Sequence, residues 1–231
     1  MRAFIFGRAK NPSDILGLSE RGHNMFSAIA KAIAISAIVA TGYVGLQTPG
    51  EAGVLKATYA SIGNSTSVPY GWVDFCQRYA GECPDNDLVA MDINLSPGAL
   101  KKLDRINRWV NNNIEPVSDM DHWGVVDQWD LPYDGKGDCE DYALMKRKML
   151  IEEGFPRQAL LMTVVKDSAN EGHAILTIKT NHGEFVLDNL HSEIKPWSTT
   201  GYRFVKRQSQ ENPNVWVTIG TPTSAPLTVS K

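Results

Sequence analysis

The stretch Gly135-Lys-Gly-Asp-Cys-Glu-Asp-Tyr142 decides how this chain is interpreted, because it places Cys139 at the first turn of a predicted helix. The residues Ala143–Leu150 are good helix formers, and Gly154 and Pro156 are stop signals beyond them. The unpaired N–H groups and the positive dipole end of a helix start stabilise a thiolate, and they can later hold the oxyanion of an acyl intermediate. The position therefore predicts a nucleophilic cysteine. Because two carboxylates flank it, we expect it to be accessible rather than buried.

A nucleophilic cysteine also needs a base and an orienting group, and two strand-like segments downstream can supply them. The segment Gly172–Ile178 alternates like a half-buried strand and carries His173 near its start. The segment Phe185–Asn189 is a second strand that carries Asp188 near its end. Antiparallel neighbours joined by a short Asn-His-Gly turn would bring the histidine and the aspartate together. The order predicts a Cys139, His173, Asp188 triad, whereas His173 taken alone would be read as a structural histidine.

The motifs around these residues resemble those of the bacterial transglutaminase-like cysteine proteinases, the family of the LapG-type periplasmic proteases. They are GDCEDYALMKR, GHAIL and VLDNL, followed by Trp216, and the likeness runs from about Val68 with INRWVNNNI and DQWDLP ahead of the cysteine. The resemblance implies a papain-like or transglutaminase-like fold and a cysteine peptidase activity. The family's catalytic cysteine, histidine and aspartate match Cys139, His173 and Asp188.

The same resemblance implies a metal and two kinds of partner. LapG-type enzymes bind calcium through acidic residues beside the cysteine, which here are Asp138 and Glu140. A protein substrate such as a surface adhesin and an inner-membrane regulatory receptor are the implied partners. The segment between Trp129 and Cys139 is shorter than in LapG-type members, which bears on the adhesin substrate more than on the chemistry.

The charges around the cysteine give calcium a physical reason. Asp138, Glu140 and Asp141 place three negative charges beside a residue that must become an anion, and a divalent cation would offset this repulsion. Calcium suits carboxylate and carbonyl oxygens in flexible loops, and the loop Asp127–Asp134 offers more of them. The alternative is that Asp138 is a helix N-cap paired with Asp141 in a near capping box. The two interpretations are compatible.

The composition bounds the class of protein. The chain has 231 residues, 42% of them hydrophobic and 21% charged, so it can bury one sizeable core. The formal net charge is −3, so the chain has no excess of basic residues, and this argues against a nucleic-acid partner. We expect one domain over residues 53–220 and a flexible tail over residues 221–231.

Residues 1–52 are expected to be an N-terminal prefix with a signal peptide. The apolar run Ala32–Ala40 follows Lys31 and has the length of a signal-peptide core. Met25 is a better start than Met1, because the first 24 residues form a mixed-charge prefix that a signal peptide does not need. Cleavage is expected after Ala40 or after residue 52, and the alternative is an uncleaved anchor. The expected location is the periplasm.

The other two cysteines agree with export. Cys76 and Cys83 lie seven residues apart with no histidine nearby for a metal site, and an oxidising compartment would let them pair. The pair would leave Cys139 as the free thiol. A reduced, buried pair is the alternative.

The remaining patterns predict an α+β fold, with helices first and a mostly antiparallel sheet after them. Ser96 and Pro97 start a helix that runs to about Asn113. The expected strands are residues 159–165, 172–179, 184–190, 202–208 and 215–219. The helix that begins at the cysteine is expected to pack on the sheet. Asn111 and Gln128 are weak candidates for an oxyanion donor.

These observations favour an exported cysteine endopeptidase that works through a thioacyl-enzyme. An acyltransferase, either a transglutaminase or an amidase, would use the same triad with an amine as second nucleophile, and the sequence does not separate the two. A domain that has become a non-catalytic binding module is the alternative from another class, and an intact triad argues against it.

Overall fold

The computed structural model describes residues 57–220. The helices are α1 (Tyr70–Arg78), α2 (Pro97–Asn113), α3 (Asp119–His122) and α4 (Cys139–Glu152), with the short 3-10 helices η1 (Ala80–Glu82), η2 (Arg157–Ala159) and η3 (Trp197–Thr199). The strands are β1 (Ile62–Thr66), β2 (Glu115–Pro116), β3 (Lys136–Gly137), β4 (Leu160–Lys166), β5 (Gly172–Thr180), β6 (Gly183–Leu187), β7 (Lys195–Pro196), β8 (Arg203–Gln208) and β9 (Trp216–Ile219).

The main sheet has the strand order β1-β9-β8-β4-β5-β6-β7, and every neighbouring pair is antiparallel. A separate parallel pair joins β2 and β3. The α+β class and the mostly antiparallel sheet expected from the sequence are thus confirmed. One detail differs from the expected order of helices first and strands after them. Strand β1 precedes the helices in the chain and pairs with β9 at the edge of the sheet. Its residues Ile62–Thr66 are largely exposed, so the sequence there lacks the alternation that identifies a half-buried strand.

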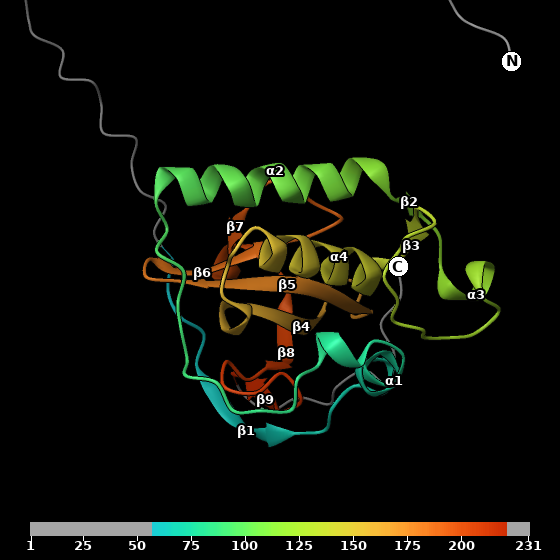
Figure 1. Ribbon diagram of the computed structural model, residues 1–231, viewed down its shortest axis with the longest axis horizontal. Helices are drawn as coiled ribbons and strands as arrows, with labels where there is room; N and C mark the ends of the chain where they lie inside the picture. The colour runs from blue at the N-terminus through green and yellow to red at the C-terminus, as the bar shows by residue number, and fades with distance from the viewer. Residues whose placement is uncertain (1–56, 221–231) are drawn as a thin grey trace, which may run out of the picture. The chain divides into compact units, whose positions relative to one another are not determined.

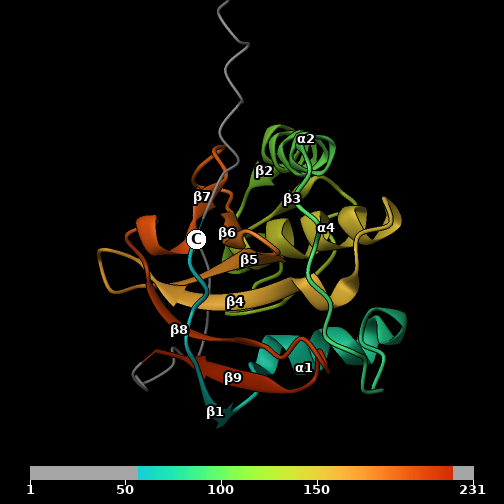
Figure 2. The same cartoon turned by 90° about the vertical axis from the view of Figure 1, so that its left-hand side faces the viewer.

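The helices lie in layers on one face of this sheet. Helix α4 packs against β5 and β4, and α2 lies across α4 on its outer side (Figures 1 and 2). Helix α2 begins and ends at the predicted residues. At its start the Ser96 hydroxyl accepts the N–H of Ala99 at 3.1 Å, and Pro97 is the first helical residue. Its residues Leu103, Ile106 and Val110 are buried on one face.

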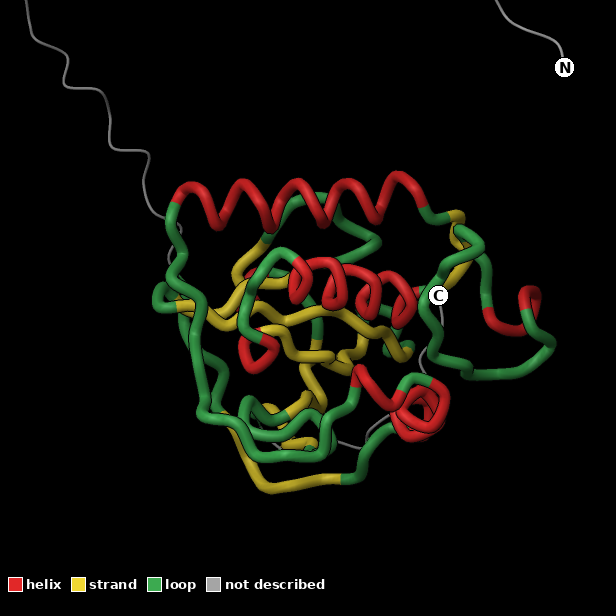
Figure 3. The backbone as a smooth tube through the Cα atoms, viewed as in Figure 1, coloured by secondary structure: helices red, strands yellow, loops and turns green. Residues whose placement is uncertain are grey.

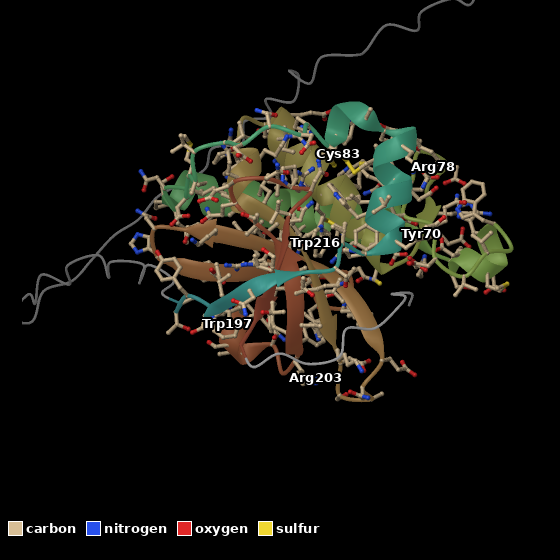
Figure 4. All side chains as sticks on the ribbon, turned by 90° about the horizontal axis from the view of Figure 1, so that it is seen from below. Tyr70, Arg78, Cys83, Trp197, Arg203 and Trp216 are labelled. Atoms are coloured by element: carbon tan, nitrogen blue, oxygen red, sulfur yellow. A yellow bond between two sulfur atoms is a disulfide. The ribbon has the colours of Figure 1, made fainter. Side chains whose placement is uncertain are left out.

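Helix α1 was not predicted, because no side-chain N-cap announces it after Pro69. Tertiary packing holds it instead. Trp72 on α1 meets Trp129 and Trp216 with ring centroids 6.3 and 6.5 Å away, in edge-to-face contacts. The expected disulfide between Cys76 and Cys83 ties α1 to η1, and Figure 4 shows Cys83 beside α1.

The expectations for the two ends of the chain lie outside the described residues. They are the prefix and signal peptide over residues 1–52, with Met25 as its start, and the tail over residues 221–231. Among residues 57–220, no helix has both the length and the apolar character needed to cross a membrane.

Candidate active site

The side chain of Cys139 lies at the first residue of α4, where the sequence predicts it, but it is only 1% exposed. The expectation of an accessible thiol was therefore wrong. Its sulfur accepts the backbone N–H of Ala174 on β5 at 3.3 Å and donates to Oε2 of Glu140 at 3.0 Å. Glu140 is itself fully buried, so the carboxylate that we expected to face water points into the protein beside the sulfur.

The structure brings His173 and Asp188 together as the strand pattern predicts. His173 is the second residue of β5, and Asp188 follows the last residue of β6. Because β5 and β6 are antiparallel neighbours, Nε2 of His173 lies 2.9 Å from Oδ1 of Asp188. Both side chains are buried, which shields their charges from water.

The pKa of His173 reflects both of its neighbours. Burial lowers the pKa, but the hydrogen bond to Asp188 and the electrostatic interactions with Asp188 and Cys139 outweigh it and raise the value to about 9. The second ring nitrogen, Nδ1, is buried and has no hydrogen-bond partner within residues 57–220. Since Nε2 is engaged with Asp188, Nδ1 is the ring nitrogen that has no hydrogen bond of its own among the described residues.

Asp188 is held by several donors. Its Oδ1 also accepts the N–H of Leu190 at 3.1 Å, and its Oδ2 accepts the Tyr202 hydroxyl at 2.6 Å. Burial would raise the pKa of Asp188, but these donors together with His173 lower it below its usual value. The backbone carbonyl of Asp188 accepts Nδ2 of Asn111 at 2.8 Å. Asn111, a candidate oxyanion donor in the sequence, thus uses its amide to hold the aspartate.

A cluster of acidic side chains lies on the other side of the cysteine. Their carboxylate oxygens come within 4.8 Å of one another in overlapping groups, whose members are Asp119, Asp127, Asp138, Glu140 and Asp141. Asp127 of this cluster belongs to the long loop between α3 and β3. Figure 3 draws this loop in green. The sequence indicated Asp138, Glu140 and this loop but missed Asp119. The sequence feature that could have identified Asp119 is the acidic segment Asp-Met-Asp at the start of α3.

Several carboxylate oxygens of this cluster are buried without a donor among residues 57–220. One oxygen each of Asp119, Asp138 and Glu140 is buried without a hydrogen-bond partner in the part of the chain that the structure describes. Burial raises the pKa of Asp138 to about 7, and burial together with the neighbouring negative charges raises the pKa of Glu140 well above its usual value. A set of converging carboxylate oxygens fits a hard cation such as calcium.

Both carboxylate oxygens of Asp141 accept backbone hydrogen bonds. Its Oδ2 accepts the N–H of Asp138, the N-cap residue of α4, at 3.2 Å, and its Oδ1 accepts the N–H of Asp130 at 2.7 Å. The predicted capping box is therefore present, with Asp138 as the N-cap and Asp141 as its partner three residues on. One oxygen of Asp138, Oδ1, still has no hydrogen-bond partner among the described residues. Gln128, the second oxyanion candidate, directs its side chain to Asp130 with Nε2 3.4 Å from Oδ2.

Comparisons with known proteins give one family match and several similar solved structures. The sequence model described as bacterial transglutaminase-like cysteine proteinase matches residues 62–224. Among solved structures, calcium-bound LapG of Legionella pneumophila is 26% identical over 58% of this chain and 77% of that chain, with a TM-score of 0.44. The EGTA-treated form of that protein is 25% identical over 57% and 73%, with the same TM-score. No curated protein matches the chain.

The family match places this chain, with its α+β fold and a buried cysteine near a histidine and aspartate pair, in the cysteine peptidase class. The family match spans more than two thirds of the 231 residues. The chain belongs to the bacterial transglutaminase-like cysteine proteinases, as the motifs in the sequence predicted.

Proposed function

We propose that this protein is an endopeptidase that cleaves a protein substrate with Cys139 as nucleophile, His173 as base and Asp188 as orienting group. The observation that carries the proposal is the 2.9 Å contact of His173 with Asp188, directly beside the strand residue that donates to the Cys139 sulfur. The expected role of each residue follows from this arrangement, because Asp188 fixes Nε2 and thereby leaves Nδ1 for the thiol.

The reaction then runs in two halves. Nδ1 of His173 takes the proton of the Cys139 thiol, and the sulfur attacks the peptide carbonyl. The imidazolium returns the proton to the departing amine, which leaves a thioacyl-enzyme. In the second half a water molecule gives a proton to His173 as its oxygen attacks the thioester. The bond from the carbonyl carbon to sulfur breaks, and the imidazolium returns the proton to the sulfur, which releases the acid and the free thiol.

The start of α4 is suited to stabilise the oxyanion of both halves. The first intrahelical bond runs from the N–H of Tyr142 to the carbonyl of Asp138 at 3.1 Å, so the N–H groups before Tyr142 precede the regular helical pattern. Such groups can donate to an oxyanion on a carbonyl held at Cys139.

We further propose that Asp119, Asp138 and Glu140 hold a calcium ion. Bound there, calcium would supply the positive charge that these buried carboxylates lack, which allows them to be ionised together. Glu140 accepts from the Cys139 sulfur at 3.0 Å in the present arrangement. A cation that engages Glu140 would therefore also free the thiol from this carboxylate.

Labelling with an acyl-substrate analogue tests the proposed chemistry. A peptide carrying a thiol-reactive electrophile should modify Cys139 and spare the disulfide-bonded Cys76 and Cys83, as mapped by mass spectrometry. The His173→Ala variant should label much more slowly. An unlabelled Cys139 in calcium-saturated protein would indicate a binding module. Products formed with and without an added amine would separate hydrolysis from acyl transfer.

We propose the periplasm as the site of action and an exported protein, such as a surface adhesin, as the substrate. The support is the apolar run Ala32–Ala40 and the resemblance of the motifs, together with a disulfide that needs an oxidising compartment. N-terminal sequencing of exported material should find a start between about residues 41 and 53. Retention of Met25 or Met1 in a membrane fraction would contradict it.

A further inference from the structure

We propose that Tyr202 is a positioning residue of this site, and that its hydroxyl holds the Asp188 carboxylate in the orientation that directs His173 toward Cys139. The inference rests on the proposed function and adds a fourth residue to it. It starts from the geometry around Asp188, where Tyr202 contributes from a segment that no sequence motif had singled out.

The contacts of Asp188 leave its carboxylate no freedom to turn. The Tyr202 hydroxyl donates to Oδ2 at 2.6 Å, while His173 Nε2 and the N–H of Leu190 meet Oδ1 at 2.9 and 3.1 Å. The two oxygens are therefore held by different partners. The Tyr202 ring also packs beside the imidazole, with centroids 5.4 Å apart at an interplanar angle of 58°. One side chain thus contacts both the aspartate and the histidine.

The turn before β8 fixes the position of Tyr202. Thr200 accepts the N–H of Tyr202 on its hydroxyl at 3.3 Å, and the same hydroxyl donates to the carbonyl of Trp197 at 2.9 Å. Gly201 between them has a φ of +80°, a value that favours glycine. Figure 4 shows Trp197 and Arg203, which frame this turn, at one end of the sheet. The hydroxyl is therefore anchored by the fold rather than by a mobile segment.

The hydroxyl remains a donor throughout the working pH range. Burial, followed by the hydrogen bond to Asp188, raises the pKa of Tyr202 above its usual value. The titratable groups that act on this hydroxyl and its acceptor are Asp188, His173, Cys139, Lys146 and His191. Because the hydroxyl draws part of the carboxylate charge to Oδ2, its removal would concentrate that charge on His173.

The Tyr202→Phe variant tests the role, because it keeps the ring and removes only the hydroxyl. In the calcium-saturated full chain, kcat should fall roughly tenfold with little change in KM, as is typical for loss of a supporting hydrogen bond. The basic limb of the kcat/KM profile should move to higher pH, since His173 would then hold its proton more tightly. The downfield proton NMR signal of the His173 and Asp188 contact should shift with it.

Tyr59→Phe is the matched control. Its hydroxyl donates to the carbonyl of Thr180 at 2.8 Å, at the end of β5 away from His173, so it removes one tyrosine hydrogen bond outside the site. Activity and pH profile should stay as in the wild type. If Tyr202→Phe behaves like this control, or if its basic limb moves to lower pH, the inference is wrong. An inactive, unlabelled wild type would instead refute the proposed function itself.

Discussion

Cys139 lies between two groups of polar side chains whose charges are balanced in different ways. The triad side consists of His173, Asp188 and Tyr202, and the acidic side of Asp119, Asp138 and Glu140. On the triad side every oxygen of the carboxylate accepts a hydrogen bond, and the pKa of Asp188 is lowered. On the acidic side one oxygen of each carboxylate has no partner within residues 57–220, and the pKa values are raised.

Burial alone does not explain this difference, because Asp188 and Asp138 are both removed from water. What differs is the supply of donors and positive charge. Asp188 has a histidine, a hydroxyl and a backbone N–H around it, whereas Asp138 is close to Asp119 and Glu140. The carboxylate on the triad side therefore has donors for both of its oxygens, and the proposed calcium ion would fill the corresponding role on the acidic side.

The largest loss of activity is expected from substitutions of the nucleophile or the base. Cys139→Ser or His173→Ala should each lower kcat/KM by roughly 10³-fold or more, because the members of such a unit act together and losing one costs nearly as much as losing all. Both variants should remain folded. His182→Ala, in the turn between β5 and β6, is the control and should be as active as the wild type. Substantial turnover by Cys139→Ser, measured with a peptide substrate, would remove the assignment of the nucleophile.

Asp188→Asn should have a smaller effect than either change, on the order of 10²-fold in kcat. The base survives in this variant, but an amide in place of the carboxylate no longer fixes the Nε2–H tautomer of His173. Steady-state kinetics should show the loss in kcat with KM nearly unchanged. An Asp188→Asn variant as active as the wild type would mean that the 2.9 Å contact is only structural.

Calcium should bind on the acidic side and affect both activity and stability. Chelation should suppress activity, and added calcium should restore it and raise the melting temperature, since saturation at about 100 times the dissociation constant adds on the order of 2.7 kcal/mol. Glu140→Gln should need more calcium for the same effect. Asp134→Asn is the control, because this exposed carboxylate pairs with His122 outside the cluster.

The capping role of Asp138 makes a different prediction for the same experiment. As an N-cap only, Asp138→Ala would lose about 1 kcal/mol of stability with or without calcium. A variant whose melting temperature no longer responds to calcium supports the metal site. If neither the wild-type melting temperature nor its activity responds to chelation and calcium, the acidic side holds no functional ion.

The parts of the fold that the sequence predicted are those with local signals. The helix at Pro97–Asn113 has a serine cap and a first-turn proline, the helix at Cys139 ends at a glycine, and β5 alternates in hydrophobicity. The strands differ from expectation mainly at their ends: β6 stops at Leu187 instead of residue 190. It stops there because the N–H of Leu190 turns back to the Asp188 side chain instead of a neighbouring strand.

The features that the sequence did not predict depend on contacts between distant segments. Asp119 meets Asp138 across 19 residues, and Tyr202 meets Asp188 from beyond the edge strand β7. The burial of Cys139 depends on Glu140 turning inward, which the neighbouring carboxylates oppose by repulsion. None of these contacts produces a periodic pattern or a cap, so only the three-dimensional arrangement reveals them.

The smallest expected effect is a shift in the pH dependence of activity, which is set by the triad side. The folded pKa of His173, about 9, lies above its ordinary value of 6.5, because its interactions with Asp188 and Cys139 outweigh burial. The charged ring thus contributes stability that is complete below about pH 6.5 and is lost as the pH rises through about 9. Once the Cys139 proton is transferred, His173 holds it for the departing amine, so activity should fall over the same upper range, where the thiolate and imidazolium pair loses that proton. In saturating calcium, the basic limb of kcat/KM should lie near pH 9. Asp188→Asn should move it to lower pH, because the carboxylate that raises the pKa is gone. A basic limb that stays in place in this variant would show that Asp188 does not set the charge of His173.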